Sequence, residues 1–217
     1  MTDQRWQHHP PRLAVTGGIG SGKSSALAFL RGLGAATLST DDLVHTLLSE
    51  PAIAAAVERR FGPEVMIGGE VNRGALARVV FGDHEALLWL ESLLHPHVRR
   101  MVTEWAAAQQ RLVTQPSLLV VEVPLLFETG TMVDMFDCVL LVTAPEEVRR
   151  RRLAAKMTHS EFTRRASRQL SEDEKAERSH FAYENRGSRA QLKQFIAETY
   201  AAILACAAAE SESLDGP

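Results

Sequence analysis

Cysteine is scarce in this chain, and long apolar runs and export signals are missing as well. Cys138 and Cys206 are the two cysteines among 217 residues. Such a distant pair makes neither a disulfide framework nor a metal site, so we expect two buried thiols in a reducing cytoplasm. No apolar stretch approaches the ~20 residues that span a bilayer. The opening residues, MTDQRWQHHPPR, lack the apolar core of a secretion signal. We therefore expect a cytoplasmic protein with no membrane partner.

An excess of positive charge is absent too, which argues against a nucleic-acid partner. The chain holds 24 Lys and Arg against 27 Asp and Glu, a net charge of −3. Ten of the basic residues lie between Arg149 and Arg178 with five acids, which leaves +5 in this segment and −8 elsewhere. Nucleic-acid-binding domains are usually basic throughout. The tract instead suits a compact anionic ligand or a solvated helix surface.

Glycine, in contrast, is concentrated in the segment AVTGGIGSGKSSALAFL, residues 14–30. Its GGIGSGKS portion matches the phosphate-loop pattern G-x-x-x-x-G-K-[ST], between an expected strand and an expected helix. Glycines allow successive backbone amides to surround a β-phosphate, while the lysine bridges the β- and γ-phosphates and the following hydroxyl binds Mg²⁺. We expect a nucleoside triphosphate and Mg²⁺ here, with Ser24 as the metal ligand. The expected nucleotide-binding residues are Gly18, Ile19, Gly20, Ser21, Gly22, Lys23, Ser24 and Ser25.

Apolar patterning predicts an α/β protein with a parallel sheet. Unbroken apolar runs over 12–16, 35–39, 118–124 and 138–145 have the form of buried strands, and helical segments alternate with them. Some eighty residues between the second and third runs contain no convincing strand, which predicts a helical insertion. Within it, residues 86–113 predict a helix broken or kinked before Pro96, with Trp89 and Leu93-Leu94 in its core. The pair His95 and His97 lacks the partners of a zinc site.

Two further carboxylate positions leave alternatives open. Asp41 and Asp42 follow the second strand, where a carboxylate can align a hydroxyl or accept its proton. Ser39 and Asp42 also fit a capping box, and spacing alone does not choose between the two acids. Glu122 ends the third strand and either holds Mg²⁺ through water or satisfies a buried polar network; it keeps an energy-transducing ATPase open. A GTPase is disfavoured because the chain has neither D-x-x-G nor N-K-x-D.

Several segments together resemble dephospho-CoA kinase from about Leu13 to Gly187. They are TGGIGSGKS, STDDLVHTLL, GGEVNRGALARVVFGD, LESLLHP, VVEVPLLFE and RQLSEDEK, in the order and spacing of that family. The resemblance implies a P-loop NTPase three-layer sandwich with a five-stranded parallel sheet. It implies three parts: a P-loop core (12–40, 114–146 and 176–210), a helical domain that binds the CoA substrate (41–113) and a short lid (147–175). The implied reaction transfers the ATP γ-phosphate to the ribose 3′-hydroxyl of 3′-dephospho-CoA, the last step of coenzyme A biosynthesis.

The same resemblance assigns residue roles. It favours Asp41 over Asp42 as the base, and it implies Lys23 and Arg152 as its catalytic partners. The residues implied to bind the acceptor are Asp41, His45, Arg73 and His95. The chain departs from the family pattern at Ser39, at Lys156, where a second lid arginine is usual, and at Ser179-His180, while Asn185 and Gly187 are kept.

The lid arginines suit phosphoryl transfer, because negative charge spreads over the equatorial oxygens of the moving group. Arg152 shares a helix face with Arg149 and with Lys156, and we expect Arg152 to contact the transition state. For Arg165 and Lys175 the alternatives are steering the nucleotide, fixing the lid and forming a surface salt bridge; of these we expect the salt bridge for each residue. The alternatives are a nucleoside or nucleotide kinase of the same fold and a non-catalytic P-loop module that binds ATP. We expect a small-molecule enzyme that is a monomer or a weak homo-oligomer.

Overall fold

The structure is a computed structural model that describes residues 10–155, 157–167 and 169–214. Lys156 and the first nine residues lie outside the described part of the chain, and so does the side chain of Arg165. The chain divides into two compact units. Unit 1 runs to Leu38 and resumes at Ala106, and unit 2 comprises Ser39–Trp105.

Unit 1 is built on a five-stranded sheet. Its strands are β1 (Arg12–Thr16), β2 (Ala36–Ser39), β5 (Leu119–Glu122), β6 (Cys138–Thr143) and β7 (Phe181–Glu184), in the order β2-β5-β1-β6-β7. Strand β1 pairs in parallel with β5 and with β6, and β6 pairs in parallel with β7. The expected five-stranded parallel sheet is confirmed. The apolar pattern alone had predicted four of these strands and missed β7.

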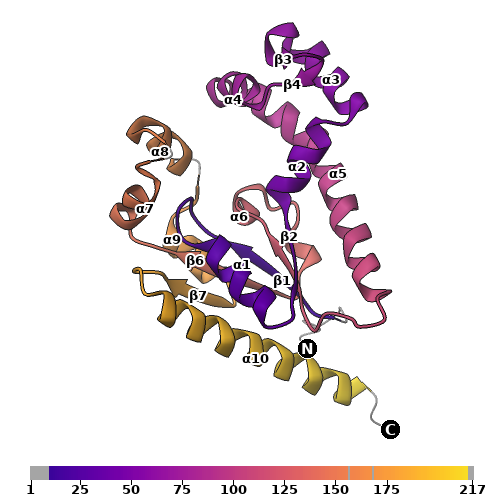
Figure 1. The fold of residues 1–217 in the computed structure, drawn as a ribbon, viewed down its shortest axis with the longest axis vertical. Coiled ribbons are helices and arrows are strands. Elements are labelled where there is room, and N and C mark those ends of the chain that lie inside the picture. Colours follow the sequence, from indigo (N-terminus) through magenta and orange to yellow (C-terminus); the bar gives the residue numbers. More distant parts are fainter. Residues whose placement is uncertain (1–9, 156, 168, 215–217) are drawn as a thin grey trace. The chain divides into compact units, whose positions relative to one another are not determined.

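The strands are apolar on both faces because helices cover both faces of the sheet. Leu13, Ala14 and Val15 are all fully buried. Helices α1 (Lys23–Gly32) and α10 (Arg189–Leu214) lie side by side, as Figure 1 shows. Their buried side chains pack against alternate residues of the strands. The remaining helices of this unit are short: α6 (Leu126–Thr129), the 3₁₀ helix Val133–Met135, α7 (Glu146–Leu153), α8 (His159–Ala166) and α9 (Glu172–Glu177).

Helix α10 and its cysteine correct two expectations. The segment Arg189–Glu210 has a mean hydropathy of 1.2 over its most apolar window and is long enough to cross a membrane by length and composition only. Leu192, Ile196 and Ile203 of this helix are buried in the core of unit 1, and 28% of the apolar window is buried. The expectation of two buried thiols is wrong for Cys206, which is exposed on α10, whereas Cys138 is buried in β6.

Unit 2 is mostly helical. Its helices are α2 (Thr40–Leu48), α3 (Pro51–Phe61), the 3₁₀ helix Pro63–Val65, α4 (Arg73–Gly82) and α5 (His84–Gln110), whose last residues belong to unit 1. Helix α5 continues through Pro96, so of the predicted break or kink at this proline the break is wrong. Trp89 meets Phe61 edge-on at a ring distance of 5.2 Å, and Leu94 is 6% exposed, whereas Trp89 and Leu93 are half-buried.

A small hairpin interrupts the helices of unit 2. Strands β3 (Met66–Ile67) and β4 (Glu70–Val71) pair antiparallel, which the expectation of a strand-free insertion missed. Gly68 and Gly69 form the turn with φ of 60° and 86°. Both values lie in the left-handed region that a two-residue hairpin turn requires, and glycine occupies that region without strain.

Candidate active site

The phosphate loop connects β1 to α1 in a conformation that needs its glycines. Gly17, Gly20 and Gly22 have φ of 137°, 76° and 113°, values that side chains with a Cβ rarely adopt. A Cβ on Gly17 would overlap the carbonyl oxygen of Val142 in β6 and would lie 3.3 Å from Ser21 Oγ. The loop is therefore wound tightly against the end of the sheet.

The loop has the features that bind a polyphosphate. Helix α1 begins at Lys23, so the positive end of its dipole faces the loop. Ser21 Oγ is fully buried in the loop and lacks a hydrogen-bond partner among the described residues. A buried hydroxyl without a partner is costly, and a phosphate oxygen would satisfy it. The loop residues thus fit the triphosphate that the sequence predicted.

Lys23 lies over this loop. Its Nζ donates hydrogen bonds to the carbonyl oxygens of Gly17 (2.9 Å) and Gly18 (3.3 Å), and it is 3.8 Å from a carboxylate oxygen of Glu122. Its side chain is 9% exposed. The ammonium is therefore held at the loop by two carbonyls and a carboxylate.

The side chains that could contact Mg²⁺ are a hydroxyl and a carboxylate. Ser24 lies exposed in the first turn of α1, and Glu122 ends β5, which is the neighbour of β1. The described residues contain no group of three or more His, Cys, Asp or Glu able to hold a metal by themselves. This donor set fits Mg²⁺, which commonly takes one or two protein ligands and completes its shell with waters and phosphates.

Arg152 and Asn185 hold the loop by its carbonyl groups. Arg152 Nη1 donates to the carbonyl oxygens of Gly20 and Ser21, at 3.0 Å each, and its Nη2 reaches Asn185 Oδ1 at 3.2 Å. Asn185 is 5% exposed, and its Nδ2 donates to the Ser21 carbonyl at 2.8 Å. Arg152 therefore lies at the phosphate loop, where its guanidinium binds loop carbonyls. Sequence reasoning gave Asn185 no role, although it follows directly on β7.

Lys175 differs most from the sequence-based expectation. We expected a surface salt bridge, but Lys175 is fully buried, 3.4 Å from Glu172 Oε1 and 3.9 Å from Glu128 Oε1. Its place at the end of the charged run EDEK resembled a solvated helix face. The burial of its neighbours, which only the fold creates, reverses that prediction.

The expected acceptor-binding residues belong to unit 2. Asp41 and Asp42 are both exposed in the first turn of α2, and His45 is one turn after Asp41 on the same helix face. Ser39 caps α2 through its backbone position without a side-chain hydrogen bond, so the capping-box alternative is wrong. Arg73 is the first residue of α4, exposed beside its cap Asn72, whose Oδ1 accepts hydrogen bonds from two backbone amides. His95 is half-buried in α5.

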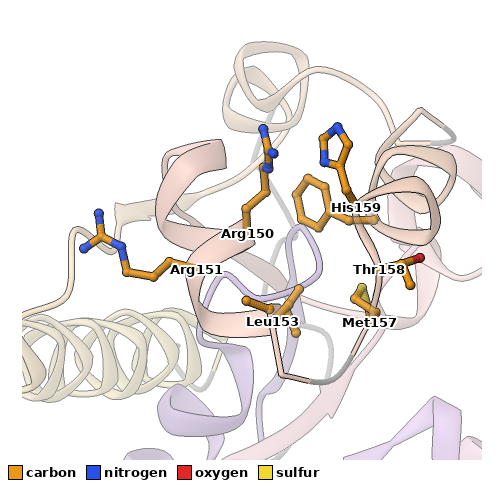
Figure 2. Close-up of a pocket in the computed structure, with 8 residues that line it drawn as sticks. Arg150, Arg151, Leu153, Met157, Thr158 and His159 are labelled. Carbon is orange, nitrogen blue, oxygen red and sulfur yellow. The ribbon is translucent and has the colours of Figure 1, made fainter.

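A cavity of about 410 Å³ lies among residues of α7, α8 and the segment between them. Figure 2 shows Arg150 extending to the same side as His159, whereas Arg151 points away from them. Leu153 lines the cavity and also packs against Gly20, where an added Cβ would lie 2.8 Å from Leu153 Cδ1. Leu153 therefore lies between the cavity and the phosphate loop, and none of the described loop residues lines the cavity.

Comparisons with known proteins identify the family. Residues 12–191 match the family model described as dephospho-CoA kinase. Two relatives with that name, from Thermus thermophilus and Protochlamydia amoebophila, are 38% and 34% identical; each match covers 87% of this chain, with 89% and 94% of the respective relative. A crystal structure from Thermus thermophilus has a TM-score of 0.75 at 38% identity and covers 91% of this chain and 98% of its own. A dephospho-CoA kinase structure from Campylobacter jejuni, at 24% identity and a TM-score of 0.58, covers 88% of this chain and 96% of its own and shares the fold. The chain therefore belongs to the dephospho-CoA kinase family.

Proposed function

We propose that this chain transfers the γ-phosphate of ATP to the ribose 3′-hydroxyl of 3′-dephospho-CoA, giving CoA and ADP. Membership of the family makes the chain an ATP-dependent kinase of coenzyme A biosynthesis. The observation that supports the reaction most strongly is the fully formed phosphate loop, with Lys23 held over it, in a chain that matches the family from residue 12 to residue 191. We also propose a cytoplasmic monomer or weak homo-oligomer that acts without a nucleic-acid or membrane partner.

The phosphate loop is proposed to bind the donor. Backbone amides of residues 18–25 surround the β-phosphate, and Ser21 Oγ donates its hydrogen bond to a phosphate oxygen. Lys23 exchanges its loop carbonyls for oxygens of the β- and γ-phosphates and neutralises charge as the γ-phosphoryl group moves. Ser24 would hold Mg²⁺ directly and Glu122 through water; the ion, when bound, neutralises charge on the β- and γ-oxygens.

Asp41 is proposed to prepare the acceptor. The ribose 3′-oxygen attacks the γ-phosphorus, the bond from that phosphorus to the β–γ bridging oxygen breaks, and ADP leaves with the electron pair. The proton of the hydroxyl passes to the Asp41 carboxylate, which also aligns the oxygen for in-line attack. His45, Arg73 and His95 bind the rest of the acceptor. Arg152 contacts the transferring group while it keeps water out of the site.

An acceptor screen tests the function. The full chain with ATP and Mg²⁺ is offered 3′-dephospho-CoA, nucleosides and nucleoside monophosphates, and thermal shift and ADP release are measured for each. We expect stabilisation and ADP release with 3′-dephospho-CoA. Release with a nucleoside or nucleotide alone would support the second candidate, a nucleoside or nucleotide kinase. ATP binding without acceptor-dependent release would support a non-catalytic ATP-binding module.

A further inference from the structure

A buried ionic cluster adjoins the phosphate loop in unit 1. We use this name for Lys175, Glu172, Glu128 and Arg149, which come from α9, α6 and α7. Lys175 is fully buried between the two carboxylates; the side chain of Glu128 is 9% exposed and that of Glu172 is 30% exposed. Glu128 Oε1 also accepts the backbone N–H of Leu170 at 3.0 Å, so this carboxylate is fixed from two sides.

The cluster reaches the phosphate loop through Arg149. Arg149 Nη1 is 3.9 Å from Glu172 Oε1, and the guanidinium lies 5.6 Å from the ring centroid of Phe162. At Gly18 an added Cβ would lie 2.6 Å from Arg149 Nη1 and 3.1 Å from Glu172 Oε1. Two members of the cluster are thus packed directly against the glycine that begins the phosphate-binding turn.

The ionic cluster contains several buried polar atoms that are not hydrogen-bonded within the described part of the chain, which costs folding free energy. Arg149 Nη1 forms the ion pair with Glu172. Several other buried polar atoms have no hydrogen-bond partner among the described residues: Arg149 Nε, one oxygen each of Glu128 and Glu172, and Gln169 Oε1. Incompletely paired buried charges contribute less stability than well-packed apolar side chains of the same volume. Stability alone therefore does not account for charged side chains at this place.

We propose that Lys175 is a positioning residue for ATP binding. Lys175 fixes the Glu172 carboxylate, Glu172 fixes the Arg149 guanidinium, and Arg149 presses on Gly18 and so holds the loop amides in the phosphate-binding conformation. Lys175 itself touches no substrate. The inference rests on the proposed function for the identity of the ligand, and it extends that function by linking helix α9 to the phosphate loop.

The test combines charge-removing variants with exposed controls. Lys175→Met removes the central cation at similar length, and Lys193→Met on α10 is its exposed control. Glu172→Gln keeps the shape and removes one charge, and the exposed neighbour Asp173→Asn is its control. Calorimetry at a temperature well below the melting point measures Kd for a non-hydrolysable ATP analogue with Mg²⁺ and, separately, for 3′-dephospho-CoA.

The positioning role predicts that the variants weaken binding of the ATP analogue but leave binding of 3′-dephospho-CoA unchanged. Lys175→Met should raise Kd for the ATP analogue about tenfold and Glu172→Gln several-fold, within the range of coupling through packed networks. Kd for 3′-dephospho-CoA should stay within about twofold, and both controls should match the unchanged chain. A lower melting temperature with unchanged affinity for the ATP analogue would overturn the proposal, because that result marks a purely structural cluster.

A double variant tests whether Lys175 acts through Arg149. Arg149→Met should weaken binding of the ATP analogue as much as Lys175→Met does, and the double variant should bind no more weakly than Arg149→Met alone. Additive losses would overturn the proposed chain of contacts. If the unchanged chain binds the ATP analogue but ignores 3′-dephospho-CoA, the proposed function fails while this inference stands. If it makes CoA but the variants bind ATP normally, this inference alone fails.

Discussion

Replacing Gly17 by alanine should damage the fold and the nucleotide site together. At φ of 137° an alanine is strained by roughly 1–3 kcal/mol. The new Cβ would also overlap the Val142 carbonyl oxygen and lie 3.0 Å from the carbonyl carbon. Both are backbone atoms of β6, so a change of side-chain rotamer cannot relieve the overlap. We expect a total loss of about 4 kcal/mol or more in the free energy of unfolding, the size reserved for severe local mechanisms.

Gly187 offers a matched control. Its φ is 119°, but an added Cβ there meets nothing within 4 Å. Gly187→Ala should therefore show the backbone strain without the overlap, a loss of roughly 1–3 kcal/mol. The difference between the two variants isolates the contact with Val142.

Urea unfolding and thermal melting measure the two variants. For a chain of this size, 1 kcal/mol corresponds to roughly 2–4 °C in Tm, so Gly17→Ala should melt about 8–16 °C lower. It should also bind ATP at least about 100-fold more weakly, because the loop must shift away from β6 and about 2.7 kcal/mol of binding is lost with it. Equal stability of the Gly17 and Gly187 variants would refute the reasoning, and so would unchanged ATP affinity in Gly17→Ala.

Three further predictions concern Asp41, Arg152 and Glu174. Asp41→Asn should lower kcat at least about 100-fold in an ADP-release assay, while Kd for ATP stays unchanged. The kcat of Asp42→Asn should stay within a few-fold of that of the unchanged chain. The reverse order would assign the base to Asp42. Arg152→Lys should raise Kd for ATP about tenfold by calorimetry, because lysine cannot reproduce the fork that binds the loop carbonyls; an unchanged Kd would contradict this role. Hydrogen bonds from the Ser171 hydroxyl and N–H lower the pKa of Glu174, so this stabilisation is complete above the ordinary pKa of roughly 4.3 and disappears as the pH falls through the lowered value. Below about pH 4.3, the free energy of unfolding should therefore fall less steeply with decreasing pH in Ser171→Ala than in the unchanged chain. Identical pH dependence of the two would rule out a contribution of Glu174 to stability.

The central strands could be predicted because their burial on both faces requires a recognisable apolar pattern in the sequence. Strands β1, β5 and β6 are buried on both faces, which produces unbroken apolar runs. Strand β7 lies at the sheet edge, and its residues alternate between half-buried and exposed, so FAYE gave no such run. The hairpin β3–β4 has strands of two residues each, too short for any periodicity to reveal.

The candidate site divides in the same way. The phosphate loop follows from local spacing, since its glycines and Lys23 act through backbone conformation within one turn. The environment of Lys175 could not be predicted, because its partner Glu128 comes from α6, far away in sequence, and only the fold brings the two together. Asn185 likewise meets Ser21 across 164 positions of the chain. The choice of Asp41 over Asp42 came from the resemblance to the family and stays a prediction.

The most direct test identifies the product made from 3′-dephospho-CoA. The chain is incubated with ATP, Mg²⁺ and this acceptor, ADP is quantified, and the position of the new phosphate on the ribose is determined by NMR spectroscopy. Our account predicts ADP and CoA in equal amounts, with the phosphate on the 3′-oxygen. ADP release that does not depend on the acceptor, or a phosphate at any other position, would contradict it.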